Sequence, residues 1–365
     1  MRSAAGCAAL GIALLLVAGT FDAEPFYVTG AALVLLGIGV AAWIGLSAWG
    51  ATMHRTLGAR SVMEDEPLSV LLEARAGRFP LPPGYVDEPL LEEPAAVRAG
   101  RRAFRLRVSV TFARRGRRRL EPAMLVLRDP LGLVERVIAS GESEEVLVLP
   151  RLYPVRTNAA GGEDTGAHAR ALLTSAAETE IDGLRQHVEG TPASRIHWPS
   201  LAKGGEMMER KLIAEADSRP LVVLDPRGAR EPEDLDAAVR AAASLTVHFA
   251  KRTGCALLLP GDRRAATVES DMTAWPAAHV RLALMDADAG PALSAAQNRR
   301  GLILFVSARR ADRPPRGLGR TPGGLVLVVP GELSGKRRPL LEVAGCQGYL
   351  GARTGSAAAM ETVAS

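Results

Sequence analysis

Cysteine is scarce in this chain of 365 residues. The three cysteines, Cys7, Cys255 and Cys346, are far apart in the sequence, so they predict neither a disulfide framework nor a four-ligand zinc site. Lysine is scarce too, because only four of the 45 basic residues are Lys. The net charge is only +5, so a nucleic-acid-binding function would need a local cluster of basic residues.

The chain also lacks the common motifs of nucleotide, esterase and metal chemistry. It contains no GxGxxG, no P-loop, no GxSxG and no HExxH, and none of its six histidines is paired with a cysteine at ligand spacing. An acyl-transfer site built on Cys255 is an alternative. A cysteine at the start of an apolar strand, however, usually packs in the core and is unreactive. We therefore expect no cofactor, no metal and no enzymatic activity.

Two long apolar runs occupy the N-terminus. Residues 3–21 and 27–49 carry no charge, and each is long enough for a hydrocarbon core that needs about 20 helical residues. The segment between them, FDAEPF, contains Pro25 and two acids, which is typical of a short turn. The sequence predicts a transmembrane helical hairpin over 1–52, with a cleavable secretory signal as the alternative for the first run.

The charges that flank these runs predict their orientation. Arg2 precedes the first run, and Arg55 and Arg60 follow the second. The connecting loop carries only acids, Asp22 and Glu24. Because basic residues are retained on the cytosolic side, we expect a cell-membrane protein with two spans and with both termini in the cytoplasm.

Short strands separated by turn signals follow the hairpin. Residues 103–113, AFRLRVSVTFA, alternate strictly between apolar and polar side chains, which is typical of a half-buried strand. Further strands are predicted at 69–75, 123–128 and 145–150. This spacing predicts a small antiparallel β-sandwich over 61–150.

The second half of the chain alternates buried strands with helices. Apolar strands are predicted at 221–225, 255–260, 301–308 and 324–330. Residues 231–254 are predicted to form a helix that begins near Pro232 and ends at Gly254, and a second helical stretch is expected at about 291–299. This alternation predicts an α/β domain over 184–350 whose parallel sheet is covered on both faces.

Two segments are expected to lie outside these domains. Residues 151–183, with many Ala and a Gly pair, are predicted to form a linker, and residues 351–365 a disordered tail. The predicted fold is therefore a membrane-anchored multidomain protein with a helical hairpin, a sandwich and an α/β domain.

Ten arginines fall between Arg98 and Arg119, and no acid lies among them. Such a run is able to bind nucleic acid or lipid headgroups. The solvent face of a strand and its turn is the alternative, and we favour it because Phe104 and Phe112 point to the opposite face and cannot stack on bases. We expect no nucleic-acid partner.

Residues 184–211 combine Arg with a large aromatic side chain in a segment expected to be loop-like. Proteins use these residue types as interface anchors. The partner-binding residues predicted here are Arg185, Arg195, His197, Trp198 and Lys203. Packing of Trp198 against the edge of the domain is the alternative, and the two interpretations are compatible.

At these residues the chain resembles a known family. After two N-terminal spans, its motifs are similar to those of the bacterial domain-of-unknown-function 58 family: FARRGRRRLEPAMLVLRDPLGLVERV, VLVLPRLYPV and SRIHWPSLAKGGEMMERK before a strand that ends in Asp. The resemblance covers most of residues 1–260 and implies a von Willebrand factor type A-like domain. It also implies genetic linkage to a MoxR-type AAA+ ATPase, the expected partner, and often to a membrane transglutaminase-like protein.

The chain departs from the family at the expected metal site. A metal-ion-dependent adhesion site has Asp-x-Ser-x-Ser after the first strand, where carboxylate and hydroxyl oxygens bind a divalent cation. Here the sequence is Asp225-Pro226-Arg227-Gly228-Ala229, so a cationic side chain stands in place of the first hydroxyl. We expect a degenerate site that binds no metal.

These features predict a non-enzymatic, membrane-tethered interaction protein that docks a partner. One alternative is a membrane-bound hydrolase centred on Asp225, with His197 nearby. Another is a nucleic-acid- or lipid-binding module built on the Arg-rich run.

Overall fold

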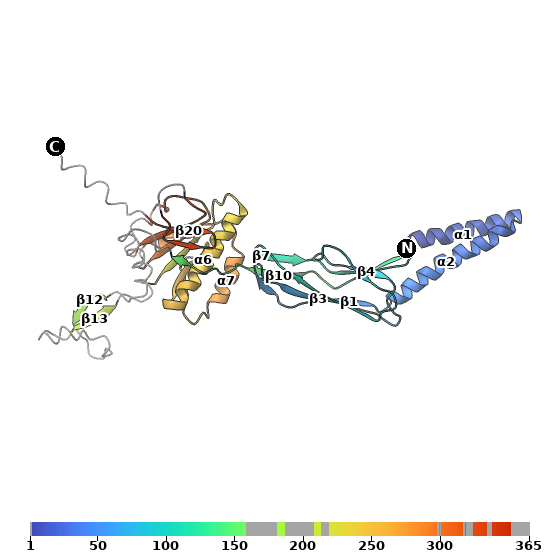
Figure 1. Ribbon diagram of the computed structural model, residues 1–365, viewed down its shortest axis with the longest axis horizontal. Coiled ribbons are helices and arrows are strands. Elements are labelled where there is room, and N and C mark those ends of the chain that lie inside the picture. Colours follow the sequence, from blue (N-terminus) through green and yellow to red (C-terminus); the bar gives the residue numbers. More distant parts are fainter. Residues whose placement is uncertain are drawn as a thin grey trace, which may run out of the picture. The chain divides into compact units, whose positions relative to one another are not determined.

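The computed structural model describes residues 2–157, 181–186, 208–212, 219–297, 299, 301–316, 318, 324–333 and 338–351. The chain divides into two compact units, Met1–Ala113 with Arg117–Val148, and Arg114–Gly116 with Leu149–Ser365 (Figure 1). Each unit has a hydrophobic core of its own.

Two long apolar helices open the first unit and pack against each other as a hairpin. They are α1 (Arg2–Phe21) and α2 (Glu24–Ala48), and both are long and apolar enough to cross a membrane. Glycine allows them to approach closely, because a Cβ on Gly11 would lie 2.6 Å from the carbonyl oxygen of Gly30. The predicted hairpin is confirmed as a pair of helices.

The connection between the helices is shorter than FDAEPF suggested. Pro25 lies in the first turn of α2, where the missing N–H costs no helical hydrogen bond. Asp22 has a φ of 50°, a left-handed conformation that Asp tolerates better than most residues. Only Asp22 and Ala23 therefore separate the two helices.

Three β-sheets complete the first unit. Their strand orders are β1-β3-β6, β2-β10-β7 and β5-β4-β8-β9. The strands are β1 (Thr52–Leu57), β2 (Ser61–Met63), β3 (Leu68–Arg75), β4 (Gly84–Asp87), β5 (Ala95–Val97), β6 (Ala103–Val110), β7 (Gly116–Leu120), β8 (Met124–Arg128), β9 (Glu135–Ala139) and β10 (Glu144–Leu149). Side chains from all three sheets share one core, to which β3, β8 and β10 contribute Leu72, Leu125 and Val146.

The strands predicted at 69–75, 123–128 and 145–150 are confirmed as β3, β8 and β10. The alternation over 103–113 is confirmed as β6, whose apolar side chains are half-buried, but the strand ends at Val110. The shorter strands were not predicted, because segments such as β2 and β5 have only three residues each and carry no readable period.

A buried guanidinium connects these sheets. Arg55 on β1 donates from Nη1 to Oε1 of Glu88 at 3.2 Å and from Nε to Oε2 of Glu144 at 2.7 Å. The carbonyl oxygens of Leu120 and Glu121 accept two further hydrogen bonds, at 3.2 and 2.6 Å. The side chains of Arg55 and Glu88 are 1% and 0% exposed. Burial raises the pKa of Glu88 even though Arg55 acts in the opposite direction.

An eight-stranded sheet, sheet D, forms the centre of the second unit, in the order β11-β19-β20-β18-β17-β14-β15-β16. Its strands are β11 (Arg156–Thr157), β14 (Leu221–Asp225), β15 (Cys255–Leu258), β16 (Ala266–Val268), β17 (Ile303–Ser307), β18 (Leu325–Pro330), β19 (Leu341–Val343) and β20 (Cys346–Leu350). The strands β14, β15, β17 and β18 are parallel to their neighbours within this group. The other four strands pair antiparallel.

The expected parallel sheet is therefore corrected to a mixed sheet. The reason is the length of the connections, because a parallel crossover needs about a dozen residues or more and short connections make antiparallel pairs. β19 and β20 are joined by Ala344 and Gly345, whose φ values of 51° and 75° suit a tight hairpin turn. β11 lies inside the range that was expected to be a linker.

Helix α6 (Pro232–Thr253) covers one face of sheet D (Figure 1) and confirms the helix predicted at 231–254. Gly254 ends it with a φ of 81°. A second helix on this unit, α7 (Trp275–Ala283), was not predicted. The helical stretch expected at about 291–299 is corrected, since the described part of it contains only a 3-10 turn at Leu293–Ala295.

The Arg55 network generates the first prediction. Arg55→Ala should destabilise the β-sheet unit by about 3–5 kcal/mol, because it leaves the carboxylate of Glu88 buried without its counter-ion. Hydrogen exchange of β1 and β10 in the full-length protein, followed against urea, measures the loss.

Arg119→Ala serves as the matched control. Arg119 pairs with Glu121, and both side chains are more than half exposed, so its removal should leave the urea midpoint unchanged. Equal midpoints for Arg55→Ala and Arg119→Ala would show that the buried network does not stabilise the unit.

Candidate functional site

The parallel strands of sheet D end at a shared edge, which contains the predicted Asp225. Asp225 is the last residue of β14 and pairs in register with Ser307, the last residue of β17. β14 lies between β15 and β17, so the chain leaves β14 on one side and later returns on the other. Open α/β sheets bind ligands outside the carboxyl ends of the strands at such a switch point. We define the carboxyl edge as this edge of β14 and β17 with the loops that follow.

The cationic side chain two residues after Asp225, that of Arg227, binds Asp225 directly. Nε of Arg227 donates to Oδ1 of Asp225 at 2.9 Å, and Nη2 donates to Oδ2 at 3.0 Å. The backbone N–H of Arg227 adds a bond to Oδ1 at 3.2 Å. This pairing raises the pKa of Arg227. A divalent cation would therefore have to displace a guanidinium from both carboxylate oxygens.

Glycines make room for the arginines of the carboxyl edge. A Cβ on Gly290 would overlap the guanidinium of Arg227. A Cβ on Gly228 would lie 3.2 Å from Cδ of Arg309, and Gly228 has a φ of 73° that few other residues adopt. Arg309 is exposed, and its backbone N–H donates to Oγ of the buried Ser307 at 3.1 Å. The side chain of Arg309 therefore lies across the turn that carries Arg227.

A third arginine extends the same surface. Nη2 of Arg310 donates to Oδ1 of Asp234, in the first turn of α6, at 3.3 Å. A Cβ on Gly331, which has a φ of 66°, would lie 3.6 Å from Cζ of Arg310. The carboxyl edge thus presents guanidinium groups, which recognise carboxylates and phosphates through paired hydrogen bonds.

The thiols of the second unit are unsuited to nucleophilic chemistry. Cys255 and Cys346 are fully buried, and burial raises the pKa of each to about 12. A thiol with such a pKa is almost entirely protonated near neutral pH and is a poor nucleophile. The acyl-transfer alternative built on Cys255 has no support in this geometry.

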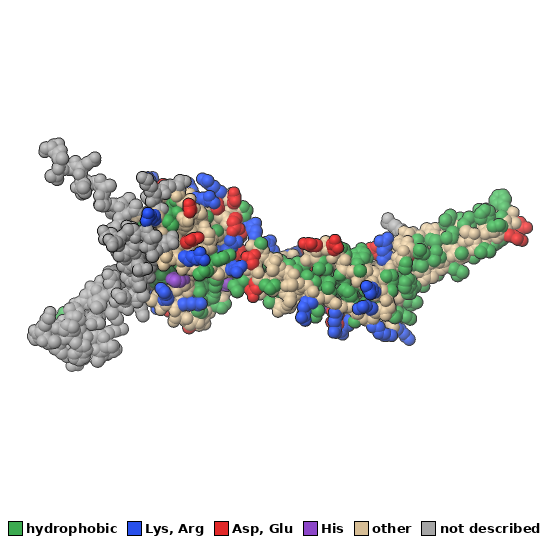
Figure 2. Space-filling view, viewed as in Figure 1, with side chains coloured by type: hydrophobic (Ala, Val, Ile, Leu, Met, Phe, Trp, Pro, Cys, Tyr) green, Lys and Arg blue, Asp and Glu red, His purple; other side chains and the backbone are tan. Residues whose placement is uncertain are grey.

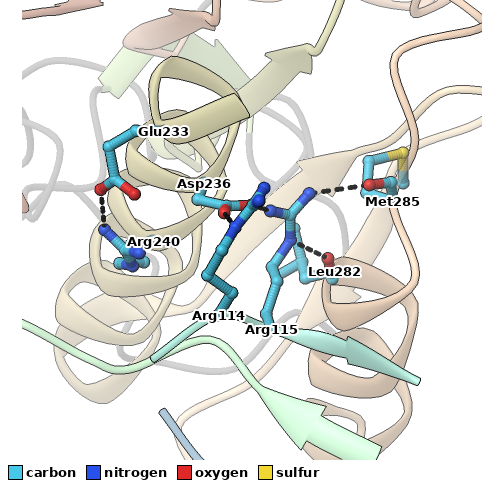
Figure 3. Close-up of polar contacts among 7 residues, drawn as sticks. All are labelled: Arg114, Arg115, Glu233, Asp236, Arg240, Leu282 and Met285. Carbon is cyan, nitrogen blue, oxygen red and sulfur yellow. Dashed lines mark hydrogen bonds and ion pairs between the residues drawn. The ribbon is translucent and has the colours of Figure 1, made fainter. Parts of the chain in front are cut away.

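The second unit contains a further ionic cluster that sequence reasoning missed (Figure 3). Arg114 and Arg115, from the Arg-rich run, both bind Asp236 on α6, and Nε of Arg114 lies 2.8 Å from Oδ2. Arg115 also donates to the carbonyl oxygens of Leu282 and Met285, at 3.3 and 2.7 Å. The side chains of Arg115 and Asp236 are each 4% exposed. Arg115 is thus a buried structural residue, whereas the side chain of Arg114 is half exposed.

The predicted partner-binding residues are described only in part. Arg185 lies on strand β12 (Ile181–Gln186), which pairs antiparallel with β13 (Met208–Leu212). The ends of the segment 184–211 are therefore strands, whereas we had expected a loop. The other four, Arg195, His197, Trp198 and Lys203, lie outside the described residues.

The Asp236 cluster predicts a difference between two neighbouring arginines. Arg115→Ala should destabilise the α/β unit by about 3–5 kcal/mol, because it removes a buried charge from a buried partner. Arg114→Ala should cost about 1 kcal/mol or less, since the side chain of Arg114 is half exposed. Urea-dependent hydrogen exchange of α6 in the full-length protein separates the two variants, and equal losses would contradict the burial argument.

The Asp225–Arg227 pair predicts weak metal binding. The full-length protein should bind no Mg²⁺ with micromolar affinity in calorimetry, because the guanidinium occupies both carboxylate oxygens. Arg227→Ser introduces a hydroxyl and removes the cation, so we expect this variant to bind Mg²⁺ more tightly than the unaltered chain. Micromolar binding by the unaltered chain that disappears in Asp225→Ala would contradict the prediction.

No protein-family model and no curated protein matches this chain. The similarity to the domain-of-unknown-function 58 family therefore remains an expectation from the motifs quoted above. The function has to be argued from the geometry of the carboxyl edge.

Proposed function

We propose that the chain is a non-enzymatic, membrane-tethered interaction protein whose α/β unit docks a partner protein at the carboxyl edge of sheet D. The observation that carries the proposal is the ion pair between Asp225 and Arg227 at the switch point of the sheet. Open α/β sheets bind ligands at this position. Here guanidinium groups line it, and these groups recognise carboxylates and phosphates on a partner.

The same ion pair argues against a hydrolase centred on Asp225. A carboxylate that acts as nucleophile or general base needs an oxygen directed at the reacting atom. Both oxygens of Asp225 instead accept hydrogen bonds from Arg227. A nucleic-acid-binding module built on the whole Arg-rich run loses two of its ten arginines, because Arg114 and Arg115 are bound to Asp236.

The resemblance supports finer parts of the proposal. The β-sheets of the first unit would form the expected sandwich, and the α/β unit would be a von Willebrand factor type A-like domain in which β14 is followed directly by α6. The partner would be a MoxR-type AAA+ ATPase, with a membrane transglutaminase-like protein in the same assembly. The helices α1 and α2 would anchor the chain in the cell membrane with both termini in the cytoplasm.

Docking at the carboxyl edge predicts a charge-sensitive interaction. Arg309→Glu in the full-length protein should weaken capture of the ATPase from detergent-solubilised membranes by about tenfold or more, as expected for an interface arginine. Arg119→Glu, the same change at an exposed position on β7, should leave capture unchanged. Equal capture by both variants would exclude the carboxyl edge as the docking surface.

A substitution of Trp198 tests the predicted partner-binding segment, residues 184–211. If it anchors the partner, Trp198→Ala should weaken binding by about 2 kcal/mol or more with little change in the melting temperature. If it packs the edge of the domain, the same change should cost about 3–5 kcal/mol of folding stability. Melting curves and binding measured on one sample distinguish the two outcomes.

A further inference from the structure

The turn between β8 and β9 packs against the membrane hairpin. Its residues Leu133 and Val134 form a small apolar cluster with Ala4 of α1 and Ile44 of α2. The backbone N–H of Ala4 also donates to the carbonyl oxygen of Leu133 at 3.2 Å. The turn and both helices belong to the first unit, so the turn is held beside the helical hairpin.

The conformation of this turn is held by a buried carboxylate. Asp129 is 3% exposed and accepts hydrogen bonds from the backbone N–H groups of Leu131, at 2.8 Å, and Val134, at 2.6 Å. Gly132 follows with a φ of 70°, which favours glycine. Between these fixed points Leu131 projects outward and is 62% exposed. A large apolar side chain is thus presented on a rigid turn.

The β8–β9 turn packs beside the apolar part of α2, close to the end of the helix, and this position places Leu131 near lipid. Val40 and Ile44, which contact the turn cluster, precede the end of α2 at Ala48. At about 1.5 Å per residue, they lie roughly 6–12 Å inside the end of the helix. Ala4 lies in the first turn of α1, at the same end. When the helices cross a bilayer, the side of the turn that faces away from them meets the acyl-chain and headgroup boundary.

A second loop reaches the same end of the hairpin and is also apolar. A Cβ on Gly77 would overlap the carbonyl oxygen of Trp49, directly after α2. Phe79, two residues further on, is 40% exposed, and the side chain of Trp49 is exposed as well. Aromatic side chains favour the interface between hydrocarbon and water.

Basic side chains lie beside the loop that contains Phe79. The carbonyl oxygens of Arg101 and Arg102 accept hydrogen bonds from the N–H groups of Leu81 and Ala76, so both arginines flank the loop that contains Phe79. Both are exposed, as is Arg78 in the loop itself. Figure 2 shows basic side chains, in blue, at the end of the β-sheets next to the helices, and all of them are arginines because the first unit contains no lysine. Part of the Arg-rich run therefore lies where anionic headgroups would be.

We infer that the first unit binds the surface of the membrane that α1 and α2 cross, with Leu131 inserted among the lipids and Arg78, Arg101 and Arg102 facing anionic headgroups. The partner of this surface is the bilayer itself. The inference goes beyond docking of a protein partner and rests on the proposal that the hairpin spans the membrane.

The test labels single cysteines in the full-length protein. Cys7→Ser removes the half-buried thiol, and Cys255 and Cys346 are buried thiols whose raised pKa makes them unreactive. An environment-sensitive fluorophore is attached at Leu131→Cys, in vesicles of phosphatidylcholine and phosphatidylglycerol. We expect blue-shifted emission, quenching by doxyl-labelled lipids and protection from iodide.

Two control positions make the outcomes distinguishable. Glu142→Cys lies in the turn at the opposite end of β9 and should be quenched by iodide, and Leu36→Cys lies within α2 and should be quenched by doxyl lipids. A label at Leu131→Cys that behaves like the one at Glu142→Cys, with Leu36→Cys still in lipid, overturns the inference and leaves the membrane anchor intact. Iodide quenching at Leu36→Cys overturns both.

Discussion

The guanidinium of Arg55 is the interaction on which the first unit depends. Its donors meet acceptors near the ends of β4, β7 and β10, while Arg55 itself lies on the strand that leaves the hairpin. A buried charge is stable only when its hydrogen bonds are made. The Arg55 side chain therefore connects β1, the strand that follows α2, to the ends of three strands in the other two sheets.

Guanidinium–carboxylate pairs recur in the second unit, and their different burial gives them different roles. The pair between Arg115 and Asp236 is almost fully buried, so it has a structural role. The pair between Arg227 and Asp225 is open on the arginine side, where 54% of the side chain is exposed. The exposed side of Arg227 can therefore contact a partner while its guanidinium stays bound to Asp225, whereas Arg115 is enclosed.

The sequence predicted the helices and strands whose residues form long or regular patterns. The two apolar runs were readable from their length and lack of charge, β6 from its alternation, and α6 from Pro232 and Gly254 at its ends. Short strands and the antiparallel edges of sheet D were missed, because turn geometry and tertiary pairing determine them. α7 was missed as well, although Pro276 near its start is an ordinary signal for a helix N-terminus. The position of Arg227 two residues after Asp225 was visible in the sequence, but its bidentate bond to Asp225 was not. Nothing in the sequence near Arg115 indicated a partner on a distant helix.

The edges of sheet D restrict how the second unit can associate with other proteins. In the described part of the chain, the outermost strands β11 and β16 have only two and three residues. Such short edge strands offer few unpaired backbone N–H and C=O groups to a strand of another molecule. Edge-to-edge aggregation is therefore disfavoured. Sheet D is therefore poorly suited to polymerising through its edges, and a partner that binds this sheet has to recognise side chains instead of adding a strand.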